Sequence, residues 1–312
     1  MKFSKFNPFN VTKTEEENRI KYKSHPHLFY VLEPNQNING VYINKFGFRS
    51  PDIEDSSDKI ILFGNSTLFG SGLYDNQTIN YYLGKLLPNY QVINTGMSGY
   101  VIEQEFYLFY YEVLRKIRNI KYIIFLDGYT EVLHTFLNKE INLPPYYKEK
   151  KKYQKYGELC IKNYFLYIKN KIKDKFLNEE EYNLPHETLL VNNYLHYINL
   201  IKDIARSRDI KAYFLIQPSL TYSIKKYDIE LQDEIKNKYY RIINKFVGLE
   251  NYIYQVYREF EKVNISNFIF MGDLFRNNIE KYYLDHAHYT EEANNLIAEK
   301  ILSIIKERTC SI

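Results

Sequence analysis

The sequence predicts a doubly wound α/β fold built on a mostly parallel five-stranded sheet, with helices on both faces and a helical insertion. Five short runs rich in β-branched and aromatic residues alternate with segments of helical pattern, and each run is almost wholly apolar. Such runs are typical of strands that are buried on both faces of a parallel sheet. The predicted strands are 59–63, 90–94, 122–126, 211–216 and 267–270.

Helical patterns separate and follow these strands. The alternation of strand and helix favours right-handed crossovers. Sheets of this type bind ligands at the carboxyl ends of their strands, where the loops gather, so we look for chemistry after each strand. The predicted helices are 78–87, 101–117, 186–207, 229–263 (broken near Gly248) and 290–306.

The N-terminal part of the chain falls outside the predicted sheet. We expect residues 1–50 to wrap over an α/β domain that spans residues 51–312. Within the wrap, the glycine of Asn44-Lys-Phe-Gly-Phe-Arg49 predicts a turn.

A second stretch, residues 139–185, is predicted to be a basic cap insertion after the third strand. Apolar residues recur in it at helical spacing, with lysines off that stripe. We interpret it as a helix that packs its apolar stripe on the core and leaves its lysines in solvent. The alternative interpretation is an interfacial helix that contacts an anionic membrane through residues 148–176 or gathers an acidic substrate.

Composition excludes several functional classes for this 312-residue chain. A net charge of +4 gives no general case for nucleic-acid binding. The two cysteines, Cys160 and Cys310, cannot by themselves build a disulfide framework or a four-ligand zinc site. The N-terminus lacks the apolar core of a signal peptide and no apolar run is long enough to span a bilayer, so we expect a cytoplasmic protein. The oligomeric state stays open.

The strongest chemical signal joins two distant segments. The first predicted strand runs into a serine, in Gly64-Asn-Ser66-Thr-Leu-Phe-Gly70, and Asp285-His-Ala-His288 precedes the last predicted helix. A serine hydroxyl needs an adjacent base before it can attack an ester. The pattern therefore predicts an acyl-transfer site in which Ser66 is the nucleophile, His288 the base and Asp285 the group that orients it.

Alternatives to this interpretation remain open at the level of single residues. Ser66 could cap the helix that follows it, and Asp285 or Thr290 could cap the last helix while both histidines are solvated. His286 competes with His288 for the role of base on proximity alone. A metal site made of these three late residues lacks a fourth ligand nearby, so we expect no metal and no cofactor.

Taken in order, these segments resemble the blocks of the SGNH, or GDSL-type, hydrolase family. The serine segment is similar to the first block and Asp285–His288 to the last. Asn94-Thr-Gly-Met-Ser-Gly99 is similar to the second block, and Phe125-Leu-Asp-Gly-Tyr-Thr-Glu131 stands where the third belongs. The resemblance implies a flavodoxin-like SGNH fold, and its spacing favours His288 over His286. Residues 44–49 also resemble the lead-in of SGNH proteins associated with bacterial surface-polysaccharide synthesis.

The resemblance further implies an oxyanion hole made by the backbone N–H groups of Ser66 and Gly99 and by a side chain of the third block. The family's asparagine is replaced there by Thr130, whose hydroxyl has a shorter reach. Loss of one oxyanion donor typically costs about 10²–10³ in rate. Asn65 and Tyr129 are candidate additional donors.

The expected function is that of a serine-dependent ester hydrolase or O-acyltransferase that forms an acyl-serine intermediate. Hydrolysis is favoured over transfer. The expected partner is a small-molecule or carbohydrate ester with a short acyl group, acetyl being favoured, and no nucleic acid. The alternative is a catalytically weakened SGNH-like protein that acts as a glycan-binding or assembly component, because of Thr130.

Overall fold

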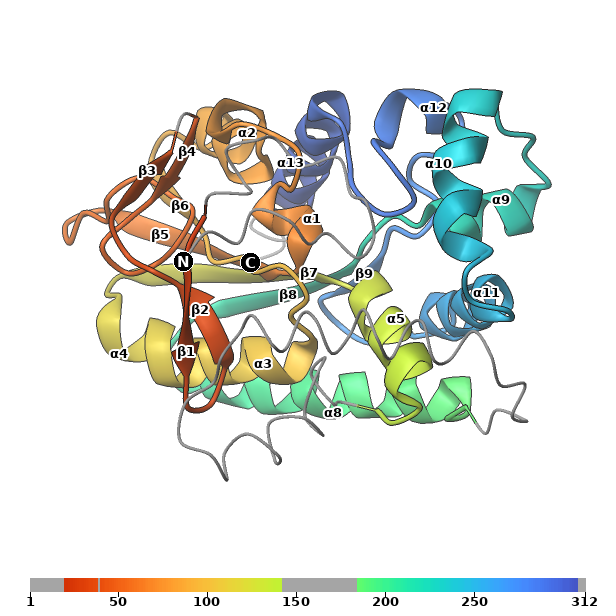
Figure 1. The fold of residues 1–312 in the computed structure, drawn as a ribbon. Helices are drawn as coiled ribbons and strands as arrows, with labels where there is room; N and C mark the ends of the chain where they lie inside the picture. Colours follow the sequence, from red (N-terminus) through yellow and green to blue (C-terminus); the bar gives the residue numbers. More distant parts are fainter. Residues whose placement is uncertain (1–19, 39, 142–183, 308–312) are drawn as a thin grey trace.

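The structure, a computed structural model, describes residues 20–38, 40–141 and 184–307. Its centre is a sheet of five parallel strands in the order β6-β5-β7-β8-β9 (Figure 1). This is the flavodoxin-like order, in which the chain starts inside the sheet and extends it on both sides. The strands are β5 (Asp58–Gly64), β6 (Tyr90–Asn94), β7 (Ile120–Asp127), β8 (Lys211–Ile216) and β9 (Phe268–Phe270).

The predicted fold class is confirmed, and the five predicted strands coincide with the observed ones to within two residues. Burial explains why the strands appear in the sequence as nearly continuous apolar runs. Every residue of β5 from Lys59 onward is buried, and so is every residue of β7 except Lys121. Helices cover both faces of the sheet, so neither face of a central strand needs polar side chains.

Two pairs of helices form the layers on either side of the sheet (Figure 1). Helices α2 (Ile79–Leu86) and α13 (Glu291–Glu307) pack against each other on one face. Helices α3 (Ile102–Tyr107) and α8 (Glu187–Arg206) lie on the other, where α8 contacts β8 and α3 contacts β5. Helix α11 (Leu249–Glu261) packs against α8.

Several further helices are short. The predicted helix 101–117 is interrupted by a π-helical turn, and the predicted break near Gly248 is confirmed, with Gly248 at a φ of +85° just before α11. The remaining helices are α1 (Ser66–Phe69), the 3₁₀ helix η2 (Asp75–Gln77), the π-helical turn η3 (Leu108–Val113), α4 (Leu114–Lys116), α5 (Tyr129–Asn138), α9 (Leu220–Tyr227), α10 (Asp233–Ile243) and α12 (Ile279–Tyr282).

The N-terminal segment forms two antiparallel hairpins, β1 (Tyr22–His25) with β2 (Phe29–Leu32) and β3 (Gln36–Ile38) with β4 (Val41–Ile43). The turn predicted over residues 44–49 is confirmed, because Gly47 has a φ of +81° and its N–H donates to the Asn44 carbonyl at 3.0 Å.

This segment also contacts the loop that follows β6. The Tyr30 hydroxyl donates to the Ser98 carbonyl oxygen at 2.5 Å, and the Tyr100 hydroxyl donates to the Tyr30 carbonyl oxygen. These bonds hold both neighbours of Gly99 against strand β2.

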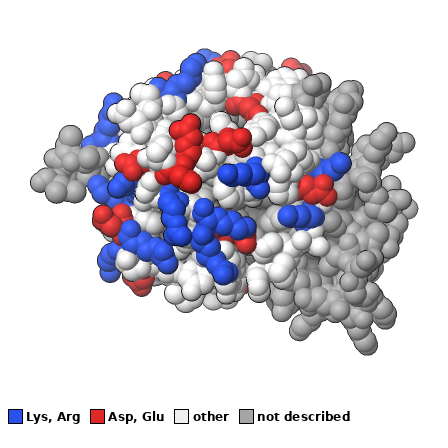
Figure 2. All heavy atoms as spheres, turned by 90° about the vertical axis from the view of Figure 1, so that its left-hand side faces the viewer, with Lys and Arg blue, Asp and Glu red and all other residues white. Residues whose placement is uncertain are grey.

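Figure 2 shows the face that lies at the left of Figure 1, where basic and acidic side chains adjoin one another. One pair of opposite charges near the start of the strands is Lys121 and Asp58, whose charged atoms lie 3.9 Å apart. In the part of the chain that the structure describes, no helix is both long enough and apolar enough to cross a membrane. The predicted cap insertion falls outside the described residues, apart from 139–141 and 184–185.

Candidate active site

Ser66 lies at the start of α1, directly beyond the carboxyl end of the central strand β5. The residue that caps this helix is Asn65, whose Oδ1 accepts from the Thr67 N–H at 3.0 Å and from the Thr67 hydroxyl at 2.9 Å. The Ser66 hydroxyl therefore does not serve as the helix cap. Ser66 is half-buried.

Two glycines permit this tight strand-to-helix turn. A Cβ on Gly64 would lie 2.8 Å from the Leu126 carbonyl oxygen, which is closer than real contacts allow. Gly70 ends α1 with a φ of +87°, a conformation that favours glycine. The N–H groups of Gly70 and Ser71 both donate to the Ser66 carbonyl oxygen at 3.1 Å. These two hydrogen bonds to the Ser66 carbonyl close the turn.

His288 brings the far end of the chain to this serine. Its Nε2 lies 2.9 Å from the Ser66 Oγ, although the two residues are 222 positions apart. Its Nδ1 lies 3.0 Å from each carboxylate oxygen of Asp285. A hydrogen bond from Nδ1–H to the carboxylate leaves Nε2 free to accept a proton from the serine hydroxyl.

Asp285 is held rigidly for this contact. Its Oδ1 also accepts from the backbone N–H groups of Ala287 at 2.9 Å and His288 at 2.8 Å. Burial opposes ionisation of this carboxyl, but the charge and hydrogen bond of His288, with the neighbouring His286, hold its pKa well below the ordinary value. Asp285 is therefore ionised at neutral pH.

The two late histidines occupy different environments. His286 is 3% exposed, its Nδ1 lies 3.6 Å from Asp285 Oδ1, and its ring meets Tyr129 edge-on at 5.7 Å. Burial lowers the pKa of His286 to about 4, so its ring is neutral at pH 7. Of the two rings, His288 is the one within hydrogen-bond distance of Ser66 Oγ.

The loop after β6 lies beside the Ser66 turn. The Met97 N–H donates to the Gly64 carbonyl oxygen at 2.9 Å, and a Cβ on Gly96 would lie 2.6 Å from the Phe69 nitrogen. Gly99 follows in this loop with a φ of +83° and is half-buried. Close packing thus brings the segment that carries Gly99 to the segment that carries Ser66.

The three candidate side-chain donors differ in what surrounds them. Thr130 is the second residue of α5 and is 6% exposed. Asn65 is 1% exposed, and its amide donates to Gln217 Oε1 at 2.8 Å. The Tyr129 hydroxyl is buried, and burial raises its pKa. The amide of Asn65 is therefore directed into the core.

Sequence reasoning missed Glu131, which joins two loops of the candidate site. Its Oε1 accepts from the Ile102 N–H at 3.0 Å and its Oε2 from the Gly128 N–H at 2.8 Å. Ile102 follows the Gly99 loop, and Gly128 precedes Thr130. Burial raises the pKa of Glu131 to about 7. A glutamate three residues after the glycine that begins a helix is a capping signal that could have identified it.

A pair of buried acidic residues lies close to Glu131. Glu105 and Asp127 are both fully buried, and Asp127 Oδ2 accepts from the Tyr194 hydroxyl at 3.0 Å. Burial raises the pKa of both carboxyl groups, and the neighbouring acidic charges add to this. Among the described residues, no three His, Cys, Asp or Glu side chains are arranged to hold a metal ion.

No family model and no curated protein matches this chain. Solved structures do match it. A lipolytic protein of the G-D-S-L family from Veillonella parvula is 12% identical, with a TM-score of 0.46, and the match covers 80% of this chain and 99% of that one. A GDSL-like lipase from Bacteroides thetaiotaomicron is 11% identical, with a TM-score of 0.41 and coverages of 82% and 93%.

An acetyl xylan esterase is 14% identical, with a TM-score of 0.39, and its match covers 79% of this chain and 99% of that one. All three TM-scores are below 0.5. The fold class of this chain rests on its own strand order, and its chemistry on its own side chains.

Proposed function

We propose that this protein is a serine-dependent acyl-ester hydrolase or O-acyltransferase of the SGNH type. The observation that carries the proposal is the 2.9 Å contact between Ser66 Oγ and His288 Nε2, with Asp285 hydrogen-bonded to the other ring nitrogen. A hydroxyl, an imidazole and a buried ionised carboxylate in this order form the arrangement that activates a serine.

In the proposed reaction, Ser66 Oγ attacks the carbonyl carbon of the ester while His288 Nε2 takes the hydroxyl proton. The ionised Asp285 stabilises the imidazolium ring that results. The N–H groups of Ser66 and Gly99 and the Thr130 hydroxyl donate to the oxyanion. Collapse of this intermediate breaks the bond to the alcohol, which leaves with the proton from His288, and the acyl group stays on Ser66.

The second half of the reaction repeats these steps with a new acceptor. His288 removes a proton from water or from a sugar hydroxyl, and the acceptor oxygen attacks the acyl-serine carbonyl. Release of Ser66 yields an acid in the first case and a new ester in the second. We favour water. A short acyl group, such as acetyl on a carbohydrate, is proposed because residues 44–49 resemble SGNH proteins associated with surface polysaccharides.

Turnover of 4-nitrophenyl acetate and labelling by a fluorophosphonate test this proposal. We expect the wild type to be labelled and to turn over, and Ser66→Ala to lose both. Ser71→Ala is the matched control, since Ser71 lies on the same turn and its buried hydroxyl has no hydrogen-bond partner among the described residues. Equal behaviour of wild type and Ser66→Ala would contradict the proposal.

A catalytically weakened glycan-binding or assembly component is the second candidate. The observation that favours it is the placement of the possible substitute donors: the Asn65 amide donates to Gln217, and the Tyr129 hydroxyl is buried. Thr130 is then the remaining side-chain donor among the three. Binding of acetylated oligosaccharides, without fluorophosphonate labelling at Ser66, would support this second function over the first.

A further inference from the structure

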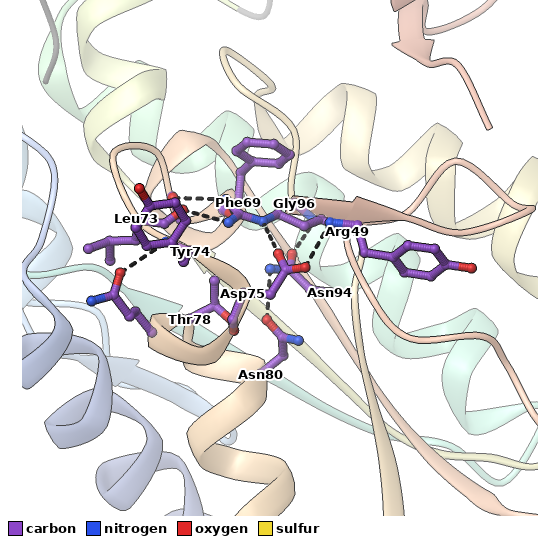
Figure 3. A network of polar contacts seen from close by, with 12 residues as sticks. Arg49, Phe69, Leu73, Tyr74, Asp75, Thr78, Asn80, Asn94 and Gly96 are labelled. Carbon is purple, nitrogen blue, oxygen red and sulfur yellow. Dashed lines mark hydrogen bonds and ion pairs between the residues drawn. The ribbon is translucent and has the colours of Figure 1, made fainter. Parts of the chain in front are cut away.

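Arg49 of the N-terminal segment is buried against the turn that carries Ser66. Its side chain is 1% exposed. Nη1 donates to the carbonyl oxygens of Phe69 at 3.1 Å and Gly70 at 2.9 Å, and Nη2 donates to that of Leu73 at 2.6 Å (Figure 3). Three backbone carbonyls of one short turn are thus held by a single guanidinium group.

The charge of Arg49 is balanced by Asp75. Nε donates to Asp75 Oδ1 at 2.8 Å, while Asp75 Oδ2 accepts from the Tyr42 N–H at 2.7 Å (Figure 3). The guanidinium also lies over the Phe69 ring, 4.9 Å from its centroid. Burying a charge is costly unless it is paired and hydrogen-bonded. Each of the three guanidinium nitrogens of Arg49 has an acceptor, which satisfies this requirement.

Two of these carbonyls, those of Phe69 and Gly70, stand at the end of a helix, where carbonyl oxygens lack partners within the helix. The Gly70 carbonyl also accepts from the Leu73 N–H at 3.1 Å. Phe69 is the last residue of α1 and Gly70 its cap, so Arg49 supplies donors to carbonyls at the point where the helix stops. The N–H groups of Gly70 and Ser71 in turn donate to the Ser66 carbonyl oxygen. A continuous path of hydrogen bonds therefore leads from Arg49 to the backbone of Ser66.

A second clamp acts on the same turn from the sheet. Asn94, the last residue of β6, donates from Nδ2 to the Leu68 carbonyl oxygen at 2.8 Å and to Asn80 Oδ1 at 3.0 Å. Its Oδ1 accepts from the Gly96 N–H at 2.9 Å, as Figure 3 shows. The carbonyls of residues 68, 69 and 70 are thus all fixed by side chains from outside the turn.

We propose that Arg49 is a positioning residue that sets the place of Ser66 relative to His288. The proposal rests on the function proposed above and extends it to a residue that contacts neither reacting group. Arginine is required rather than lysine, because a planar fork can serve several acceptors at once and a single ammonium group cannot. A misplacement of about 1 Å in a catalytic group can cost about 10²-fold in rate.

The test uses Arg49→Lys with two independent readouts on the full chain. The first is chemical: the rate of fluorophosphonate labelling of Ser66, together with kcat and KM for 4-nitrophenyl acetate. We expect labelling and kcat to fall about 10²-fold while KM changes little. The second is hydrogen exchange of the Gly70 and Ser71 amides, which we expect to become faster.

Lys59→Met is the matched control. Lys59 is also fully buried, and its ammonium donates to the Ser57 carbonyl oxygen at 2.6 Å. It lies at the opposite end of β5, the strand that leads into Ser66. Loss of this buried cation tests the general effect on stability, and we expect labelling and exchange at the turn to stay at wild-type values.

Wild-type labelling or wild-type exchange in folded Arg49→Lys would overturn the proposal. If the wild type itself is neither labelled nor active, the proposed function fails, and the exchange of Gly70 and Ser71 still decides whether Arg49 holds the turn. If Arg49→Lys does not fold, Arg49→Gln places a neutral amide at this position. The same two measurements on Arg49→Gln then support or overturn the proposal in the same way.

Discussion

At the scale of single residues, the candidate site depends on the charge of one buried carboxylate. Both oxygens of Asp285 lie 3.0 Å from Nδ1 of His288, and the low pKa of Asp285 keeps it ionised throughout the neutral range. An amide in its place would keep the shape of the side chain but could present an N–H to the ring. The imidazole would then turn or change tautomer.

We therefore expect Asp285→Asn to lower kcat for 4-nitrophenyl acetate by about 10⁴-fold at pH 7. The control is Asp203→Asn on the exposed surface of α8, where the side chain is 71% exposed. Single-turnover labelling of Ser66 measures the same effect without product release. An Asp285→Asn rate within a factor of about ten of the wild-type rate would contradict the assigned role.

Thr130 is the second test at this scale. If its hydroxyl donates weakly to the oxyanion, Thr130→Asn should raise kcat by up to about 10²-fold, because the longer asparagine side chain brings an amide N–H closer to the oxyanion. Thr135→Asn, on the same buried helix, is the control for the change of residue type. If Thr130→Asn binds glycans as the wild type does and shows no gain in turnover, the result would favour the second candidate function, a glycan-binding or assembly component.

At the scale of elements, the strands were predictable and several helices were not. The three inner strands β5, β7 and β8 are almost wholly buried, so their apolar composition alone identifies them. Helix α5 has the sequence Tyr-Thr-Glu-Val-Leu-His-Thr-Phe-Leu-Asn, which is rich in β-branched and aromatic residues. Local propensity therefore argues against a helix here, and tertiary packing with the Glu131 cap overrides it.

Helix α5 also carries a buried base whose titration should affect stability. Burial lowers the pKa of His134 to about 3, whereas an unfolded histidine has a pKa of about 6.5. The unfolded chain therefore binds more protons as the pH falls below about 6.5, and the folded state loses stability in that window. This single group contributes a loss of about 2 kcal/mol in the free energy of unfolding between about pH 7 and pH 5.

Urea denaturation of His134→Gln at these two pH values measures the effect. The variant should show a pH dependence shallower than that of the wild type by about 2 kcal/mol. His196→Gln, on the exposed side of α8, should retain the wild-type dependence. Parallel curves for His134→Gln and wild type would show that the histidine is not held neutral.

At the scale of the whole molecule, the N-terminal segment supports two loops of the candidate site. Arg49 contacts the Ser66 turn, and Tyr30 contacts the residues on either side of Gly99. We expect Tyr30→Phe to lower the free energy of unfolding by about 1 kcal/mol and to slow labelling of Ser66. Tyr81→Phe, at an exposed position of α2, is the control. Labelling at the wild-type rate would confine Tyr30 to a role in stability.

The sequence indicated the groups that carry the candidate chemistry more readily than those that support it. Ser66, Asp285 and His288 stand in short patterns whose order along the chain is informative. Arg49 and Glu131 bind backbone groups of segments remote in sequence, and no local pattern reveals which carbonyl or N–H a side chain will meet. Supporting residues of this kind become visible only when the tertiary contacts are known.

The 222 positions between Ser66 and His288 also have a consequence for biosynthesis. At about 5–20 residues per second, a ribosome needs roughly 10 to 45 s to travel from one codon to the other. Throughout that interval the nascent polypeptide contains the Ser66 hydroxyl but not the His288 imidazole that would activate it. Any esterase activity would begin only after His288 has been translated and has left the ribosome.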